Sequence, residues 1–279
     1  MSEVKEIRLE SVESVIKETQ QKHIPSKVQA DTLFTFTNKL EWIITPLRSK
    51  MLSPRYCKED IRYLGIEGLE LIALPMRCFC DINLHRLGDH LEWYGYYGLA
   101  FSKDWGMKKK IQPIQYINPE SDLCKDFSTA FFAALSDESE TQSEAQIKLQ
   151  NYILHQIMYY KPYSGVFSNR RTGEASEKCY TDECEWRFVP DVSIEEYPQV
   201  IFDEEILNAG SLVNISNAME GLSSISLTFE YSDIKYIIVN TMADFREITT
   251  VISELDVADT EKYDLISKVI VWENSKGDF

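Results

Sequence analysis

The chain has 279 residues, of which 44% are hydrophobic and 27% are charged, a composition that excludes a disordered or fibrous protein. It carries 29 Lys and Arg against 45 Asp and Glu, so the net charge is 29 − 45 = −16. No apolar run reaches the roughly 18 residues that cross a bilayer, so the sequence predicts no transmembrane helix and no membrane partner.

The negative charge is concentrated in the last third of the chain. Residues 1–180 hold 23 basic and 24 acidic side chains (23 − 24 = −1), whereas residues 181–279 hold 6 and 21 (6 − 21 = −15). Because Lys and Arg provide the affinity for phosphate backbones, this distribution disfavours nucleic-acid binding only in the last third. An acidic surface there favours solubility or a basic partner.

The N-terminal residues are charged throughout and contain no apolar signal-peptide stretch, which predicts a cytoplasmic protein. Cysteines in the cytoplasm are normally reduced, so free thiols are expected. The six cysteines are Cys57, Cys78, Cys80, Cys124, Cys179 and Cys184.

Apolar residues recur at spacings of three and four over residues 3–22, which predicts an amphipathic helix. A proline-containing connector follows at 23–31, and the alternation of β-branched and aromatic residues over 32–37 predicts a strand. We therefore divide the chain into an N-terminal helix with its connector (1–30) and a single α+β domain with an acidic C-terminal third (31–279).

Asn38 is predicted to cap a helix that starts at Lys39, and Pro46 should end or kink this helix before Lys50. Prolines and glycines are spread over residues 51–75, so this stretch is expected to include irregular structure.

Short strands are predicted at 76–80 and 97–101, with a helical or loop-like segment at 81–94 between them. A further strand is predicted at 111–117, where Pro113 indicates an edge or strand-end position because proline cannot donate to a sheet ladder.

Residues 120–160 are the most helical part of the chain, with an acidic break at 137–144. A loop rich in Gly, Ser and Arg is predicted at 164–178, followed by a strand at 185–189.

The C-terminal third is predicted to contain a helix at 242–255 and strands at 199–202, 224–230, 234–239 and 266–272. Strands that are interrupted by helices without a regular βαβ rhythm indicate an α+β fold.

Metal and nucleotide motifs are weak or absent by spacing. Cys78 and Cys80 are separated by one residue instead of the usual two to four, and His85 and His90 miss the i, i+4 spacing, so no metal site is predicted. The sequence has no Walker, Gly-x-Gly-x-x-Gly or Gly-x-Ser-x-Gly motif, which excludes the signatures of P-loop NTPases, Rossmann enzymes and serine hydrolases.

Two segments could carry chemistry. The aromatic–glycine segment Trp93–Gly98 offers rings that stack on a ligand beside glycines that allow close approach, or it forms a tight turn packed by core aromatics. Glu185 places a carboxylate on a mostly apolar strand, where it either pairs with Arg187 as a structural salt bridge or acts in a cleft.

Several short motifs occur in a fixed order: Phe34–Thr37, Pro54–Glu59, Pro75–Ile82, His90, Tyr94–Phe101, Lys103–Gly106, Pro113–Tyr116 and Glu183–Arg187. As an ordered set over residues 32–190, they resemble the AbiGi-type abortive-infection family of phage-resistance proteins. The segment 233–239 fits this family more loosely. The family is described as the antitoxin-like partner in a two-gene system.

The motifs also resemble DarT-like ADP-ribosyltransferases. This resemblance implies an ADP-ribosyltransferase-like fold of small sheets with inserted and flanking helices, with NAD bound as substrate between two small sheets. Glu185 would be the catalytic residue, because its carboxylate would hold the ribose 2′-hydroxyl and stabilise the positive charge that develops as nicotinamide leaves.

The cofactor-binding residues that this resemblance implies lie in three places. Thr35 and Thr37 would contact the nicotinamide ribose, Tyr94 or Tyr97 would stack on the nicotinamide, and Arg55 would meet the pyrophosphate. Thr35 stands where a histidine is expected, and a hydroxyl does not reproduce the reach of an imidazole, which favours the antitoxin alternative.

Three functions therefore follow from the sequence. The first is an enzyme that transfers ADP-ribose from NAD to a nucleic-acid or protein acceptor. The second is an antitoxin that neutralises a co-encoded toxin by direct binding, to which an acidic surface would contribute. The third is a structural subunit that docks through residues 3–22.

Overall fold

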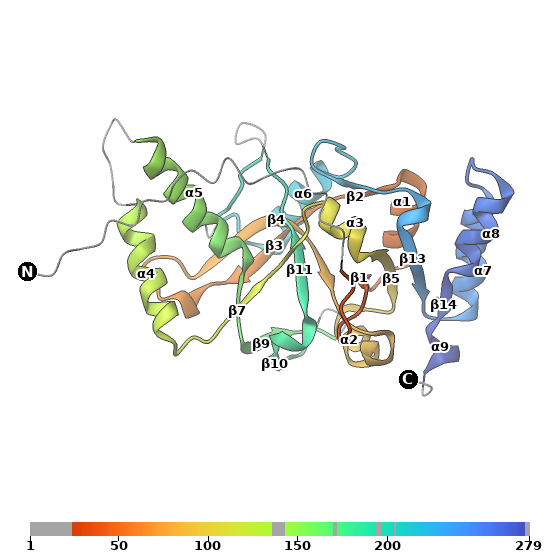
Figure 1. Cartoon of the computed structure of the whole chain (residues 1–279), viewed down its shortest axis with the longest axis horizontal. Coiled ribbons are helices and arrows are strands. Elements are labelled where there is room, and N and C mark those ends of the chain that lie inside the picture. The colour runs from red at the N-terminus through yellow and green to blue at the C-terminus, as the bar shows by residue number, and fades with distance from the viewer. Residues whose placement is uncertain (1–23, 136–142, 170–171, 193–196, 204, 277–279) are drawn as a thin grey trace, which may run out of the picture.

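The computed structural model describes residues 24–135, 143–169, 172–192, 197–203 and 205–276, and within them the main element is an eight-stranded sheet (Figure 1). The strand order is β14-β13-β5-β1-β4-β11-β6, and β3 pairs with the free part of β4. These strands are β1 (Thr32–Thr37), β3 (Arg55–Asp60), β4 (Leu71–Cys80), β5 (Tyr97–Ser102), β6 (Gln112–Pro113), β11 (Glu185–Phe188), β13 (Ile234–Val239) and β14 (Val269–Val271). Within the described residues, the strand pairings of this sheet are antiparallel except that of β13 with β14.

Small two-stranded sheets flank the main one. They pair β2 (Met51–Leu52) with β12 (Leu227–Thr228), β7 (Gln115–Ile117) with β8 (Tyr160–Pro162), and β9 (Ser164–Ser168) with β10 (Ala175–Cys179). The β7–β8 pair is parallel, and β9–β10 is a hairpin.

Helices cover both faces of the sheet. They are α1 (Glu41–Ser49), α2 (Leu87–Tyr94), α3 (Lys103–Lys108), α4 (Asp122–Leu135), α5 (Glu144–Tyr159), α6 (Ala209–Ala218), α7 (Met242–Ser253), α8 (Asp259–Ser267) and α9 (Trp272–Ser275). Short 3-10 turns lie at Arg62–Leu64, Leu84–Arg86, Tyr180–Glu183 and Tyr231–Asp233. In Figure 1, α4 and α5 lie at one end of the molecule, and α7 and α8 lie at the other.

Alternation along the strands divides the core between the two faces. Leu33 and Phe79 point to the face that α1, α3, α7 and α8 cover, where the largest apolar cluster lies. Phe34 and Cys80, one residue further along, point to the opposite face and pack with α2 and α9. Because successive residues of a strand point to opposite faces of the sheet, the position of each residue along its strand determines the layer in which its side chain packs. The α4–α5 pair packs on the same side as Cys80, over Ile72, Leu74 and Met76 of β4.

The expected α+β fold class is confirmed. The strands predicted at 32–37, 97–101, 185–189 and 234–239 correspond to β1, β5, β11 and β13. The helices predicted within 81–94, 120–160 and 242–255 correspond to α2, to α4 with α5, and to α7. Pro113 lies in β6, the edge strand, as its missing N–H requires.

The predicted cap of the first described helix is wrong, whereas its predicted end before Lys50 is confirmed. α1 begins at Glu41 after Leu40, not after an Asn38 cap, and it continues one turn past Pro46 to Ser49. Ile43, Pro46 and Leu47 are buried, so apolar packing outweighs the loss of the hydrogen bond that Pro46 cannot donate. Lys50 then ends the helix with a left-handed backbone (φ 53°).

The stretch at 51–75 contains more sheet than expected, because β3 and the first half of β4 lie there. Pro75 sits inside β4 opposite Tyr56. The N–H of Tyr56 points away from β4 and donates to Ser216 Oγ at 2.9 Å. The pair therefore exchanges no ladder hydrogen bond, and Pro75 costs the sheet none.

Four other predictions are corrected by the structure. The loop predicted at 164–178 is the β9–β10 hairpin. The strand predicted at 199–202 is reduced to a bridge between Ala73 and Ile201, and the one at 224–230 to Leu227–Thr228. Part of 266–272 belongs to α8, a helix that was not predicted, and neither was α6.

Some expectations lie outside what the structure tests. The helix predicted at 3–22 falls outside the described residues, so the division of the chain at residue 30 stays a prediction. Among the helices that the structure describes, none combines the length and the apolar character needed to cross a membrane.

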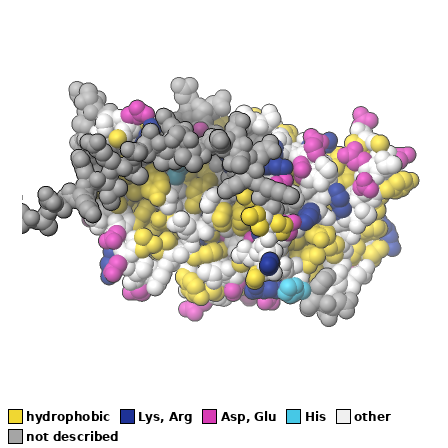
Figure 2. All heavy atoms as spheres, in the orientation of Figure 1, with side chains coloured by type: hydrophobic (Ala, Val, Ile, Leu, Met, Phe, Trp, Pro, Cys, Tyr) yellow, Lys and Arg dark blue, Asp and Glu magenta, His cyan; other side chains and the backbone are white. Residues whose placement is uncertain are grey.

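Acidic side chains gather at the end of the molecule that α7 and α8 form, on the right in Figure 2. Exposed carboxylates of this end include Glu254, Asp256, Asp259 and Asp264.

Candidate functional site

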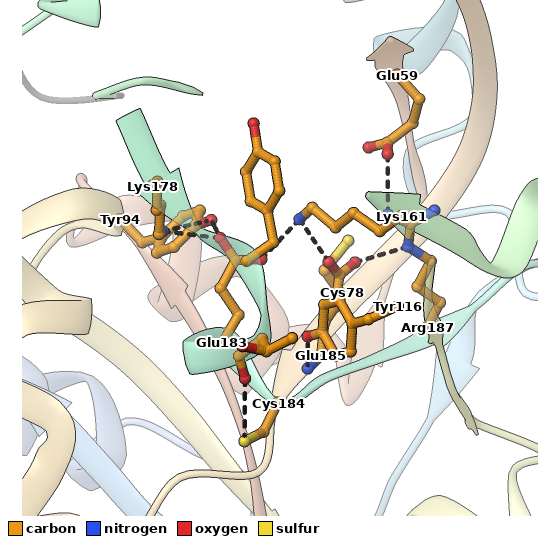
Figure 3. A network of polar contacts seen from close by, with 12 residues as sticks. Glu59, Cys78, Tyr94, Tyr116, Lys161, Lys178, Glu183, Cys184, Glu185 and Arg187 are labelled. Carbon is orange, nitrogen blue, oxygen red and sulfur yellow. Dashed lines mark hydrogen bonds and ion pairs between the residues drawn. The ribbon is translucent and has the colours of Figure 1, made fainter. Parts of the chain in front are cut away.

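A buried network of charged side chains lies where β8, β10 and β11 meet (Figure 3). Its centre is Lys161 on β8, whose ammonium donates to Glu183 Oε2 at 2.6 Å and to Glu185 Oε2 at 2.8 Å. The side chain of Lys161 is 11% exposed, and those of Glu183 and Glu185 are 4% and 6% exposed. One cation therefore joins two carboxylates almost out of contact with water.

Arg187 completes one side of the network. Its Nε donates to Glu185 Oε1 at 2.6 Å, and one terminal nitrogen donates to Glu59 at 2.9 Å. The other terminal nitrogen donates to the carbonyl of Met158, and the guanidinium is fully buried. The pairing of Glu185 with Arg187, one of the two alternatives that the sequence left open, is confirmed.

Lys178 and Tyr94 complete the other side. Lys178 Nζ lies 2.7 Å from Glu183 Oε1, and the Tyr94 hydroxyl donates to the same oxygen. The Lys178 ammonium also lies over the rings of Trp93, Tyr94 and Phe167 at 4.7, 4.4 and 4.8 Å. These contacts attach the β9–β10 hairpin to α2.

The turn before β11 explains why two glutamates face one lysine. Cys184 adopts a left-handed backbone (φ 42°) between the 3-10 turn that carries Glu183 and the strand that carries Glu185. A non-glycine residue in this region costs about 1–2 kcal/mol. The N–H of Glu185 donates to the Tyr116 hydroxyl at 2.9 Å, which ties the start of β11 to β7.

Opposite charges keep the network ionised. Burial would raise the pKa of Glu185, but Arg187 and Lys161 hold it far below its ordinary value. Burial would lower the pKa of Lys161, but Glu185 and Glu183 raise it well above its ordinary value. Lys178 is the exception, because burial lowers its pKa more than Glu183 raises it.

The charges of the network balance. The carboxylates of Glu59, Glu183 and Glu185 are matched by the cations of Lys161, Lys178 and Arg187. Both oxygens of Glu185 accept from cations, and so do both oxygens of Glu183. Held ionised and bonded on both oxygens, neither carboxylate is poised to exchange a proton at neutral pH, and the arrangement suits a structural junction.

The residues predicted to bind NAD do not all meet at this network. Tyr94 and Glu185 are joined through Glu183 and Lys161. Thr37, in contrast, lies opposite Tyr97 in the β1–β5 ladder, and Tyr97 packs against the cluster on the α1–α7 face.

Two other predicted residues lie apart from Glu185 as well. Thr35 shares a face with Thr37 and accepts from Arg77 Nε at 3.1 Å. Glu185 pairs with Cys80, which points to the opposite face. Arg55, at the start of β3, donates to Asn217 in α6 at 3.2 Å.

The glycines of the aromatic–glycine segment allow close packing of backbones. A Cβ on Gly95 would lie 2.3 Å from the carbonyl oxygen of Thr37, and one on Gly98 would lie 2.5 Å from the Phe36 ring. Gly95 also has φ +109°, which L side chains rarely adopt. These contacts match the tight-turn alternative for Trp93–Gly98.

Four charged members of the network, Glu59, Glu183, Lys161 and Lys178, were missed by sequence reasoning. Glu183 lies in the motif Glu183–Arg187, where a second carboxylate two residues before Glu185 was the available signal. Lys161 and Lys178 stand alone in their strands, and nothing in their spacing relates them to Glu183. Only the folded sheet brings them together.

Metal ligands show no comparable cluster. Among the described residues, no group of three or more His, Cys, Asp or Glu side chains is arranged to hold a metal ion. The six cysteines are free, and burial raises the pKa of the Cys78 and Cys80 thiols well above their ordinary value.

Comparison with known proteins gives one consistent family. The family model described as "Putative abortive phage resistance protein AbiGi, antitoxin" matches residues 49–240. The "Abortive phage resistance protein AbiGi" of Lactococcus lactis subsp. cremoris is 32% identical over 246 residues, which cover 81% of this chain and 98% of that protein. No solved structure matches the chain.

Proposed function

The chain belongs to the AbiGi family of abortive phage resistance proteins, and from this premise we propose that it is an antitoxin that neutralises a co-encoded toxin by direct binding. The description of the family as an antitoxin supports this function. As an antitoxin of this kind, the protein catalyses no reaction and acts by binding the toxin with its surface.

The closed ion network is the observation that carries this proposal. A catalytic glutamate must leave an oxygen available for substrate, whereas Glu185 has both oxygens bonded to the buried Arg187 and Lys161. Removing one partner from such a network leaves an uncompensated buried charge. Glu185 therefore acts as part of the scaffold that holds β11 against β8.

ADP-ribosyl transfer from NAD to a nucleic-acid or protein acceptor is the alternative. Its supporting observation is that Tyr94 and Glu185 belong to one polar network. Against it, Thr35, Thr37 and Tyr97 lie on the other face of the sheet, so these residues do not surround one dinucleotide with Glu185.

Two kinds of experiment distinguish the two functions: rescue of bacterial growth from the toxin, and binding and turnover of NAD by the purified chain. The toxin encoded beside this chain is expressed in a bacterial host with and without it, and wild-type chain is expected to restore growth. In parallel, purified chain is titrated with NAD by calorimetry and incubated with labelled NAD and a lysate. We expect neither heat of binding nor label transfer.

The Glu185→Gln variant provides the discriminating comparison. Label transfer by wild-type chain, lost in a Glu185→Gln variant that still folds by circular dichroism, would replace the antitoxin proposal with the enzyme. Because Glu185 is buried in the network, the NAD titration of wild-type chain decides the question even if the variant does not fold.

A further inference from the structure

A second feature lies on the opposite face of the sheet from the ion network. A groove of about 620 Å³ is lined by the start of α1, by α7 and by Tyr97 of β5; we call it the α1–α7 groove. Its walls include Glu41 and Trp42 from α1 and Asp244 and Glu247 from α7.

The polar side chains of the groove are mainly hydrogen-bond acceptors. Three carboxylates line it against a single ammonium, that of Lys39, so the described walls carry −3 + 1 = −2. Glu41 and Glu247 form no ion pair with another described residue. Asp244 Oδ1 has only a long contact of 3.4 Å with the Tyr97 hydroxyl. A cationic ligand would complement these walls.

An unsatisfied hydroxyl lies beside Tyr97. Thr37 is directly opposite Tyr97 in the β1–β5 ladder, so both side chains leave the sheet on the same side. Thr37 is 8% exposed, and its Oγ1 has no hydrogen-bond partner among the described residues. A buried polar atom without a partner is costly. Thr37 is not among the residues that line the groove, so this buried oxygen lies next to the groove and not in it.

Trp42 provides an independent indication of a cationic ligand. Its side chain is 51% exposed, which is unusual for a residue of this size. The ammonium of Lys39 already lies 5.1 Å from the centre of its ring. The indole therefore binds a cation within this molecule, and tryptophans of this kind are frequent anchors of protein interfaces.

Most of the groove lies outside the part of the chain that the family model matches. Seven of its eight lining residues lie outside residues 49–240, the range that the family model covers, and Tyr97 is the exception. The groove is close to the acidic α7–α8 end of the molecule, which would attract a positively charged protein surface before contact.

We infer that the α1–α7 groove binds a lysine- or arginine-bearing segment of the toxin, with Trp42 against the basic side chain and Glu41, Asp244 and Glu247 around its charge. This inference rests on the proposed antitoxin function and identifies the surface that performs it. Tyr97, expected from the sequence to contact NAD, lines this groove, and Thr37 lies opposite it in the β1–β5 ladder.

Binding measurements with the purified toxin test the inference. Trp42→Ala is expected to raise Kd at least about tenfold, as truncation of a buried interface anchor does. Glu247→Gln is expected to slow association several-fold and to weaken the dependence of association on salt. Biolayer interferometry at two salt concentrations gives both quantities.

Matched surface variants serve as controls. Tyr263→Ala removes an exposed aromatic ring from α8, and Glu220→Gln removes an exposed carboxylate after α6. Both should bind as wild type does, and all four variants should keep the wild-type melting temperature.

The possible outcomes distinguish a failure of the inference about the groove from a failure of the antitoxin proposal. If wild-type chain binds the toxin and the Trp42→Ala and Glu247→Gln variants bind it equally well, the groove is not the binding surface, and the antitoxin function stands. If wild-type chain does not bind the toxin, both the antitoxin proposal and the groove are overturned.

Discussion

The pKa of His90 shows how burial in the core determines the protonation state of a side chain. Its ring stacks on Tyr94 at 4.5 Å and contacts Phe36 at 5.4 Å. Burial lowers the pKa of His90 to about 3; Glu183 opposes this shift, and Lys178 adds to it. The imidazole is therefore neutral in the folded protein, although an ordinary histidine is partly protonated near pH 6.5.

We expect the stability of the protein to fall as the pH is lowered from about 7.5 to about 5. Below about pH 6.5 the unfolded chain binds a proton at His90 that the folded chain does not, so the free energy of unfolding decreases by about 2 kcal/mol from pH 7.5 to pH 5. Urea unfolding at several pH values measures this loss, which should be absent in His90→Phe.

His155→Phe, at an exposed position of α5, provides the matched control for replacing a histidine with phenylalanine. The range above pH 5 avoids the titration of Glu183 and Glu185, whose pKa values are lowered. If the free energy of unfolding of His90→Phe depended on pH as that of the wild type does, His90 would not be the group responsible for the loss of stability.

At the scale of elements, the connection from α2 to β5 depends on glycine. The N–H of Gly95 donates to Leu91 at 2.9 Å and ends α2, while its positive φ turns the chain into β5. The close approach of Thr37 leaves no room for a side chain there. This turn sets the register of β5 against β1, and hence the face on which Tyr97 lies.

Replacing Gly95 with alanine is expected to destabilise the protein by more than about 3 kcal/mol, because strain at φ adds to a steric clash with backbone. Gly68 is the matched control: it also has positive φ (+78°), but nothing lies within 4 Å of a Cβ built there. Gly68→Ala should cost only about 1 kcal/mol. Equal losses for both variants in urea unfolding would show that the backbone contact at Gly95 has no effect.

For the whole molecule, the acidic third is not a detachable tail. β13 is an interior strand that pairs with β5 and β14, and its Ile237 and Val239 are buried in the largest core cluster. Two of the carboxylates in this third, Glu183 and Glu185, are neutralised by cations that include Lys161 from the first part of the chain. The surplus negative charge that can attract a partner is therefore found at the surface, including the α7–α8 end.

A chain truncated after residue 190 is expected not to fold, because β5 would become an edge strand and the core cluster on that face would lose its cover. Size-exclusion chromatography and thermal unfolding by circular dichroism would show aggregation or no cooperative transition. Truncation after Lys276 is the control and should preserve the wild-type melting curve. A cooperative transition in the shorter chain would contradict this view of the fold.

Local patterns in the sequence determined much of the secondary structure. The alternation at 32–37 and the apolar run at 234–239 were sufficient to predict β1 and β13, because strand propensity and burial act on neighbouring residues. The β9–β10 hairpin was missed because its exposed polar residues carry little hydrophobic pattern. The resemblance to the AbiGi family also came from ordered motifs alone.

The tertiary structure decided which side chains meet. In sequence, Glu185, Thr37 and Tyr97 were equally plausible neighbours, and only the pairing of β1 with β5 and of β11 with β4 assigns them to opposite faces. A shift of one residue in either register would reverse that assignment, because side chains alternate along a strand. The partners of Glu185 and the groove beside Tyr97 therefore depend on long-range strand pairing, which no local pattern encodes.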